Sequence, residues 1–149
     1  MTQASQTKRL KDQVALVTGG GRGIGRAIAQ SLAAAGAVVA VTSRSADELN
    51  ETVHMIETDG GRAAAYPADV TEAAQMQSTV TAIEALLGPI DVLVNNAGSP
   101  GPLKPLLETE VNEWWRAMEV NLLGPLLCAR LLLPGMVSRR RGRIINVSS

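Results

Sequence analysis

The stretch TGGGRGIG, residues 18–25, decides the fold, because two kinds of apolar periodicity meet there. Residues 14–18, which lead into it, are apolar and mostly β-branched, as expected for a short strand buried on both faces. After the glycines, Ile24, Ile28 and Leu32 recur at every fourth position, which predicts a helix with this stripe facing the core. A buried strand, a glycine turn and a helix are the first unit of an α/β fold.

The same alternation continues along the rest of the chain. Further strands are expected at residues 37–42, 63–66, 91–94 and 143–147, with helical patterns between them. Such a rhythm predicts parallel strands joined by right-handed crossovers, with helices covering both faces. The expected fold class is therefore α/β: a Rossmann-like, doubly wound parallel sheet in three αβα layers, truncated after the fifth strand.

Local signals predict where three of the helices begin or bend. Ser45 and Glu48 have the spacing of a capping box, so a helix should start there. Thr71 is a candidate cap for the next helix. Pro125 lies inside a long apolar helix, where a proline ring removes one backbone hydrogen bond, so a kink is expected.

The spacing of the glycines distinguishes between known phosphate-binding turns. A P-loop needs Lys and Ser or Thr after its last glycine, but Arg26 and Ala27 follow here. The spacing G-x-G-x-x-G fails at every register, whereas G-x-x-x-G-x-G fits Gly19, Gly23 and Gly25. Glycines allow close backbone approach, and a helix N-terminus offers free N–H groups to a pyrophosphate. The alternative is a glycine-rich turn that binds no ligand.

This octet resembles the T-G-x-x-x-G-x-G signature of the short-chain dehydrogenase/reductase family. Four more motifs follow in that family's order: Asp69-Val70 after the third strand, N-N-A-G at residues 95–98, Asn121 within a helix, and INVSS at residues 145–149. The resemblance runs from about residue 12 to the last residue. It implies a dinucleotide-binding domain over residues 12–149, incomplete at its C-terminus, behind a polar tail over residues 1–11.

The end of the second strand indicates which nicotinamide nucleotide is preferred. In NAD-dependent members of such folds, an acidic residue there bonds the adenosine ribose. Residues 41–45 read VTSRS, and the first carboxylate, Asp47, already belongs to the next helix. Arg44 and Arg22 can instead face a 2′-phosphate, with no carboxylate expected to repel it. NADP is therefore the expected cofactor and NAD the less favoured one. The expected cofactor residues are Gly19, Gly21, Arg22, Gly23, Ile24, Gly25, Ser43, Arg44, Asp69, Val70, Asn96, Ala97 and Gly98.

The resemblance also implies catalytic roles for two residues. Ser149 matches the serine that holds the substrate oxygen, and Asn121 matches the asparagine that orders a water in the proton relay. A helix-interior asparagine that bonds its own backbone is the alternative for Asn121. The family's Tyr-x-x-x-Lys pair is missing, because the one tyrosine is Tyr66 and residue 70 is Val.

Three hypotheses follow from this departure. The first is an NADP-dependent oxidoreductase that transfers a hydride between nicotinamide and a carbonyl or alcohol substrate, of which the chain is an N-terminal portion inactive by itself. The second is a non-catalytic dinucleotide-binding module or cofactor sensor. The third is a fragment that does not fold stably alone.

Composition excludes several other classes of function. Fourteen basic and fourteen acidic residues cancel, so nucleic acid and anionic membranes are not expected partners. The single cysteine, Cys128, fits a reducing compartment, and His54 has no partner spaced for a metal. The apolar residues 120–137 are too interrupted by Gly, Pro and Arg for a membrane span. A cytoplasmic protein is expected and, by resemblance, a homo-oligomer (dimer or tetramer) when intact.

Overall fold

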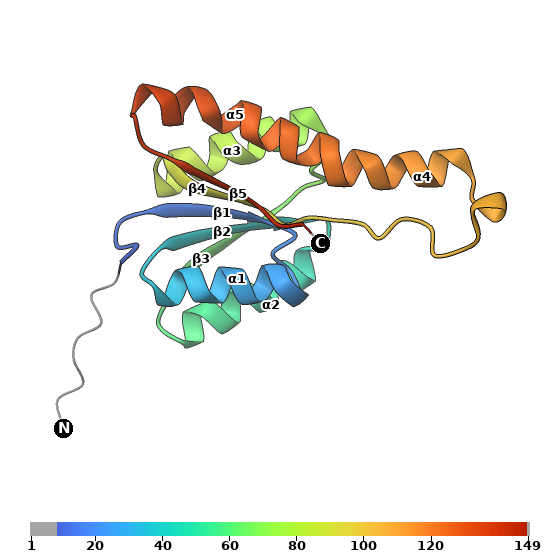
Figure 1. Ribbon diagram of the computed structural model, residues 1–149. Coiled ribbons are helices and arrows are strands. Elements are labelled where there is room, and N and C mark those ends of the chain that lie inside the picture. Colours follow the sequence, from blue (N-terminus) through green and yellow to red (C-terminus); the bar gives the residue numbers. More distant parts are fainter. Residues whose placement is uncertain (1–8, 149) are drawn as a thin grey trace.

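A computed structural model describes residues 9–148 of the chain as a single five-stranded parallel sheet with helices on both faces (Figure 1). The strand order is β3-β2-β1-β4-β5, so the chain reverses its direction of growth between β1 and β4. Ligands of such sheets bind beyond the carboxyl ends of the strands at this reversal. The strands are β1 (Val14–Thr18), β2 (Val38–Ser43), β3 (Arg62–Pro67), β4 (Ile90–Asn95) and β5 (Arg143–Asn146).

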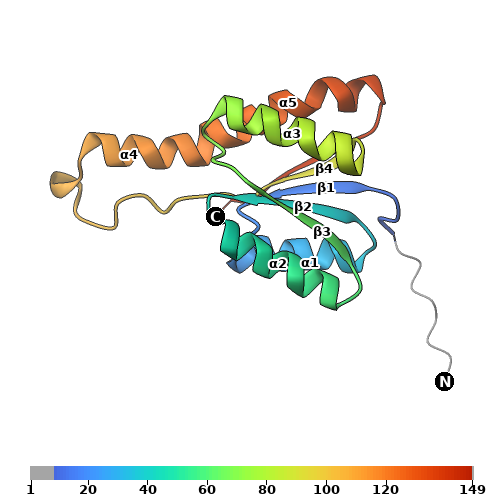
Figure 2. The same ribbon diagram turned by 180° about the vertical axis from the view of Figure 1, so that it is seen from behind.

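The helices form the two outer layers. Figures 1 and 2 show α1 and α2 below the sheet and α3 and α5 above it, while α4 extends beyond the carboxyl ends of the strands. The predicted α/β, Rossmann-like, three-layer fold is thereby confirmed. The helical segments are α1 (Gly23–Ala34), α2 (Ala46–Thr58), α3 (Ala73–Leu87), η1 (Leu106–Glu108), α4 (Val111–Met118), the π-helical turn η2 (Glu119–Leu123) and α5 (Gly124–Ser138).

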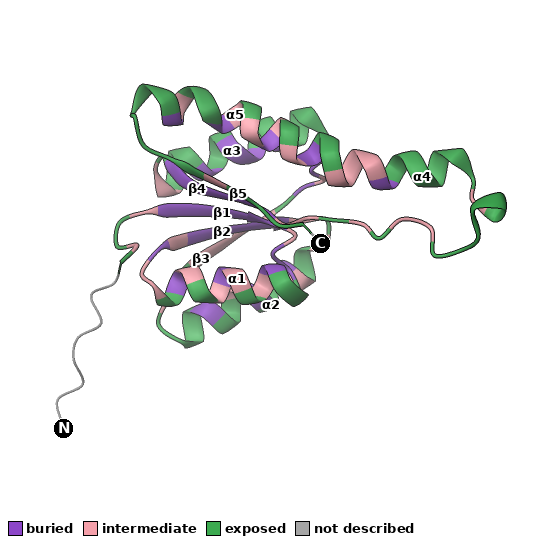
Figure 3. Ribbon diagram, in the orientation of Figure 1, coloured by how far each residue is buried: buried purple, intermediate pink, exposed green. Residues whose placement is uncertain are grey.

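The core lies on both faces of the central strands. Every residue of β1 and β4 is buried, as Figure 3 shows for the middle of the sheet. One apolar cluster packs beneath α3 and α5 and the other beneath α1 and α2. This two-sided burial explains why the strands read as continuous apolar runs. β5 is different: Ile145 is 46% exposed, so the edge strand is only partly covered.

The predicted inward face of α1 is wrong by one residue position. Ile24 is 66% exposed, and Ile28 and Leu32 lie at the margin of the core. The buried residues are Gly25, Ala29 and Ala33. This series also recurs at every fourth position, and its small side chains let the helix approach β1 closely.

Two of the other local expectations need correction, and one is confirmed. Ser45 caps α2, and its hydroxyl accepts a hydrogen bond from the Glu48 N–H at 3.4 Å. Thr71 does not cap α3, which begins after Glu72; its hydroxyl donates to Asp69 instead. The irregularity expected at Pro125 lies just before it, in the π-helical turn. Because Pro125 has no N–H for the carbonyl four residues earlier, the turn widens there.

Two further expectations concern the N-terminal tail and the apolar helical run near the end of the chain. Residues 1–8 of the expected polar tail lie outside the described residues. The helical run Val111–Ser138 is continuous, and an 18-residue window within it has a mean hydropathy of 1.6. By length and composition alone this run could span a membrane, which the expectation of a too interrupted segment did not foresee. These criteria alone are a weak argument, because core helices meet them too. Here Cys128, Leu132 and Met136 of this run pack against the sheet.

Candidate functional site

One open cleft lies beyond the carboxyl ends of β1 to β4 and has a volume of about 680 Å³. All the residues expected to bind a cofactor line it, from Gly19 to Gly98. The cleft therefore brings together motifs that are almost eighty positions apart in the sequence. Sequence reasoning missed the remaining lining residues, which are Ser45, Glu48, Ala68, Ser99, Arg116 and Val120.

The glycine turn forms the floor of this cleft under tight steric limits. A Cβ on Gly25 would overlap the carbonyl oxygen of Gly19 and the side-chain amide of Asn96. Gly19 has a positive φ of 64°, and a Cβ there would lie 2.9 Å from the Cα of Ala97. These positions accept only glycine because backbone, rather than a flexible side chain, occupies the space. The N-terminus of α1 begins directly at this turn, with its free N–H groups.

Two side chains from outside the motif hold the carbonyl groups of the turn. The hydroxyl of Thr52, which is fully buried on α2, lies 3.0 Å from the Gly20 carbonyl oxygen and 3.2 Å from that of Gly21. Arg26 Nε donates to the Gly21 carbonyl at 3.0 Å, and Arg26 also pairs with Glu51 at 2.7 Å. These hydrogen bonds satisfy the carbonyl groups of Gly20 and Gly21 from behind, and the N–H of Gly20 donates to the Thr42 carbonyl at 3.3 Å. The sequence analysis noted Arg26 only as the residue that follows the last glycine, and it did not single out Thr52.

The N-N-A-G segment is tied to the same turn. Asn96 Nδ2 donates to the carbonyl oxygens of Thr18 and Gly19, at 3.1 and 3.2 Å. The backbone N–H groups of Asn96 and Ala97 both donate to the Thr18 hydroxyl at 3.0 Å. The ends of β1 and β4 are thus joined across the point where the sheet reverses. Gly19, Asn96 and Ala97, which take part in this cross-link, all line the cleft.

At the end of β2, the cleft carries two arginines and a carboxylate. Arg22 and Arg44 are both exposed and line the cavity together with Ser43. Glu48 lines it as well, and its Oε1 lies 3.9 Å from Arg22 Nη1. The expectation that no carboxylate lies near this end is therefore wrong. The helical turn that starts at Ser45 points Glu48 back toward the glycine turn.

At the end of β3, Asp69 is held by an ion pair from the other side of the cleft. Arg116 Nη2 of α4 lies 2.7 Å from Asp69 Oδ2, and the N–H and hydroxyl of Thr71 donate to Oδ1 at 2.9 and 2.7 Å. Partial burial raises the pKa of Asp69, but the hydrogen bonds from Thr71 and the charge of Arg116 outweigh it, so the pKa lies below its ordinary value. Asp69 is an anion at neutral pH and is fixed in position.

The family of the chain follows from comparison with known proteins. The family model described as short chain dehydrogenase matches residues 13–149. The chain belongs to the short chain dehydrogenase family. The glycine turn and the N-N-A-G segment both lie within the matched residues.

Individual relatives agree with this assignment. The chain is 41% identical over 143 residues to a short chain dehydrogenase of Pseudocercospora fijiensis, covering 95% of this chain and 46% of the relative. It is 36% identical over 141 residues to the 2-dehydro-3-deoxy-D-gluconate 5-dehydrogenase of Formosa agariphila, covering 94% and 53%. It also resembles the crystal structure of a metagenomic short-chain oxidoreductase in complex with NADP, with a TM-score of 0.90 and 40% identity, covering 95% and 64%. The chain spans about half the length of the curated relatives it matches.

The two catalytic residues expected for a short chain dehydrogenase have different outcomes. Ser149 lies outside the described residues. Asn121 lies in the π-helical turn, and its side chain clamps the backbone of Ser99: Oδ1 accepts from the Ser99 N–H and Nδ2 donates to the Ser99 carbonyl, both at 2.8 Å. The alternative that Asn121 bonds its own helix is wrong. Its part in a proton relay stays a prediction.

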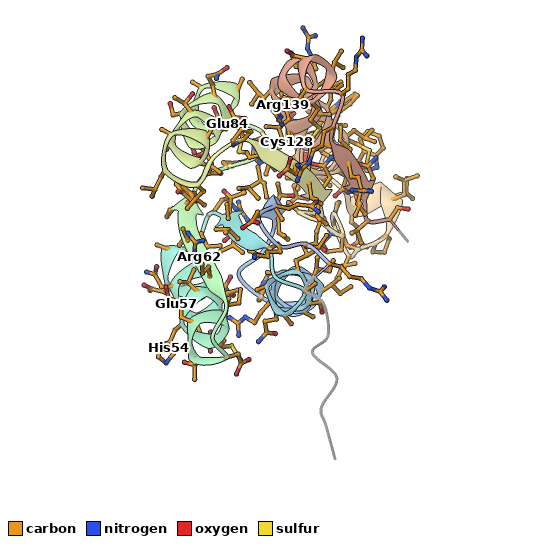
Figure 4. The ribbon with its side chains drawn as sticks, turned by 90° about the vertical axis from the view of Figure 1, so that its left-hand side faces the viewer. His54, Glu57, Arg62, Glu84, Cys128 and Arg139 are labelled. Atoms are coloured by element: carbon orange, nitrogen blue, oxygen red, sulfur yellow. The ribbon has the colours of Figure 1, made fainter. Side chains whose placement is uncertain are left out.

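The remaining titratable candidates lie away from the cleft. Tyr66 packs against the core from β3, its hydroxyl is buried without a partner, and burial raises its pKa. Burial also raises the pKa of the Cys128 thiol to about 11, so this cysteine is a packed residue. Figure 4 shows His54 on the outer surface of α2. Within residues 9–148, no group of three His, Cys, Asp or Glu side chains is placed to hold a metal.

Proposed function

We propose that this chain is the cofactor-binding part of an NADP-dependent oxidoreductase, which transfers a hydride between nicotinamide and a carbonyl or alcohol group of a small molecule. The observation that carries the proposal is the single cleft that unites the glycine turn, the N-N-A-G segment and two arginines. Gly23 lines the cleft, and nothing lies within 4 Å of the place that a Cβ there would take, so a diphosphate can approach the backbone of the turn closely. The residues present therefore fit a dinucleotide.

Each part of the cleft has a distinct task in this proposal. The N–H groups of the turn and of the α1 N-terminus bind the diphosphate, while Thr52 and Arg26 keep the turn in shape. Asp69 and Val70 line the adenine end. Asn96 to Gly98 border the nicotinamide end, and the bound nicotinamide supplies or accepts the hydride.

The preference for NADP rests on the end of β2. Arg22 and Arg44 line the cavity there, and a charge-assisted hydrogen bond to a phosphate contributes about 1.5–3 kcal/mol, or about 10- to 100-fold in affinity. The related metagenomic oxidoreductase, which is 40% identical, was crystallised with NADP. NAD lacks the 2′-phosphate and gains nothing from these two cations.

For catalysis, the proposal assigns Ser149 to the substrate oxygen and Asn121 to the proton relay. The chain by itself is proposed to be inactive, because Tyr66 is its one tyrosine and lies against the core instead of in the cleft. A proton-transfer group contributes about 10²–10⁴ in rate. The position of Tyr66 outside the cleft also favours a second candidate function, a non-catalytic dinucleotide-binding module or cofactor sensor.

We also propose that the intact protein is a cytoplasmic homo-oligomer that uses the α4–α5 surface. Large apolar side chains are exposed there, including Leu122, Leu126 and Val137. An apolar surface of this kind is typical of a protein contact.

Calorimetric titration of the purified chain with NADPH, and separately with NADH, tests the cofactor assignment. We expect NADPH to bind about 10- to 100-fold more tightly than NADH. An Arg44→Gln variant should lose much of this difference, because it removes one cation from the phosphate end while leaving the turn intact. Equal affinity of the unmodified chain for both nucleotides would refute the NADP preference. Binding of neither nucleotide to the folded chain would refute the proposed function and the sensor alternative together.

A further inference from the structure

Glu48 is the one carboxylate that shares the phosphate end of the cleft with Arg22, among the residues that the structure describes as lining it. It lies in the first turn of α2, and its side chain is 39% exposed. A Cβ on Gly21 would come within 2.9 Å of the Glu48 Cβ, so the glycine turn packs directly on this side chain. The neighbouring carboxylate, Asp47, is exposed and does not line the cleft.

The geometry places one cation between two possible anions. Arg22 Nη1 is 3.9 Å from Glu48 Oε1, and the Arg22 side chain is 82% exposed to solvent. A 2′-phosphate that binds Arg22 must therefore share it with the carboxylate or displace it. Like charges within several ångströms of one another weaken binding, whereas a neutral ribose hydroxyl can donate a hydrogen bond to a carboxylate.

We propose that Glu48 is a specificity-determining residue that narrows the preference of this site for NADP over NAD. The Glu48 carboxylate competes with the 2′-phosphate of NADP for the Arg22 guanidinium, which weakens the binding of NADP. The same carboxylate provides a hydrogen-bond acceptor for the 2′-hydroxyl of NAD. In NAD-dependent members of such folds, that acceptor comes from the end of the second strand, where this chain has Ser43 and Arg44. Here it comes from the following helix. The inference rests on the proposed function, because it assigns a role within the same cofactor site.

A matched pair of substitutions tests this role. Glu48→Gln removes the charge but keeps the size of the side chain against Gly21. Asp47→Asn removes an equal charge from the same helical turn, outside the cleft, and so controls for the effect on the helix dipole. The dissociation constants of NADPH and NADH are measured for both variants and for the unmodified chain at low ionic strength, after thermal unfolding has established that all three are folded.

We expect Glu48→Gln to bind NADPH more tightly by about threefold, and at most about fivefold, because exposed ion pairs have small energies. NADH should bind equally well or more weakly, so that the ratio of the two constants changes. Asp47→Asn should leave the ratio unchanged. Added salt should reduce the effect of Glu48→Gln, because the interaction is between partly exposed charges.

The possible failures are distinguishable. If the unmodified chain binds both nucleotides and Glu48→Gln has the same ratio as Asp47→Asn, the inference about Glu48 is wrong and the proposed function is unaffected. If the folded chain binds neither nucleotide, the proposed function is wrong and the inference falls with it.

Discussion

The two sides of the cleft are built by different means. On the side of β1, α1 and α2, the glycine turn has no room for a Cβ at Gly25, and Thr52 and Arg26 occupy its carbonyl groups. On the side of α4 and α5, a single apolar face packs on the sheet while Leu126 and Val137, 55% and 70% exposed, point away from it. The glycine turn on the first side is held by steric fit and hydrogen bonds. The second side buries an apolar helix face and adds the Arg116–Asp69 ion pair at the end of β3.

This difference indicates how each side responds to change. Backbone atoms in close contact cannot relax around an added methyl group, so the glycine side should be intolerant at single positions. An apolar helix face loses only the side chain that is removed, and its exposed positions should be almost neutral.

The largest effect is expected from Gly25→Ala. The new Cβ would overlap the Gly19 carbonyl oxygen, so the turn must shift at a cost of about 3 kcal/mol or more, and nucleotide binding should be lost. Gly23→Ala is the control: a Cβ there meets nothing within 4 Å, and only its φ of 53° costs about 1 kcal/mol. Urea denaturation gives both values. Equal stability of the two variants would show that the turn is not sterically closed.

An intermediate effect is expected from Leu132→Ala on the other side. Leu132 is 3% exposed on the buried face of α5, and its truncation should cost about 2–4 kcal/mol in the free energy of unfolding. Leu126→Ala, on the same helix but 55% exposed, should cost less than about 0.5 kcal/mol. Denaturation at several protein concentrations measures both. A concentration-dependent loss for Leu126→Ala would mean that a second copy covers this face in solution.

The smallest effect is expected from Arg116→Met, which cuts the ion pair that links the two sides. The pKa of Asp69 is lowered in the folded state, so its contribution to stability is present above its ordinary pKa and is lost as the pH falls through the lowered value. The variant should therefore be slightly less stable at neutral pH and should match the unmodified chain in strong acid.

Denaturation midpoints across this pH range, and NMR titration of the Asp69 carboxyl carbon, measure the effect. Lys104→Met is the control, because it removes a similar exposed pair with Glu113 at 2.6 Å and leaves Asp69 untouched. An Asp69 titration that is identical in all three proteins would contradict this account of its pKa.

Sequence reasoning succeeded where a signal is local. The strand at residues 14–18 agrees with β1, and Ser45 caps α2 as expected. It failed for α1, because Ile24 and Gly25 each begin a series of small or apolar residues at every fourth position, and only contact with the sheet decides which faces inward. It also failed to place Glu48 in the cleft, because the position of a residue in a helix does not tell toward which neighbouring element its carboxylate points.

The amino-acid sequence by itself determined the order of strands and helices, the parallel sheet and the position of the glycine turn. Each of these depends on periodicity or on conformational preference within a few residues. Only the tertiary structure decided that Glu48 and Arg116 line the cleft and that Thr52 holds the glycine turn, because no sequence pattern links these helix residues to the turn. Their roles arise from distances between atoms far apart in the chain, and such distances exist only once the sheet has brought the ends of its strands together.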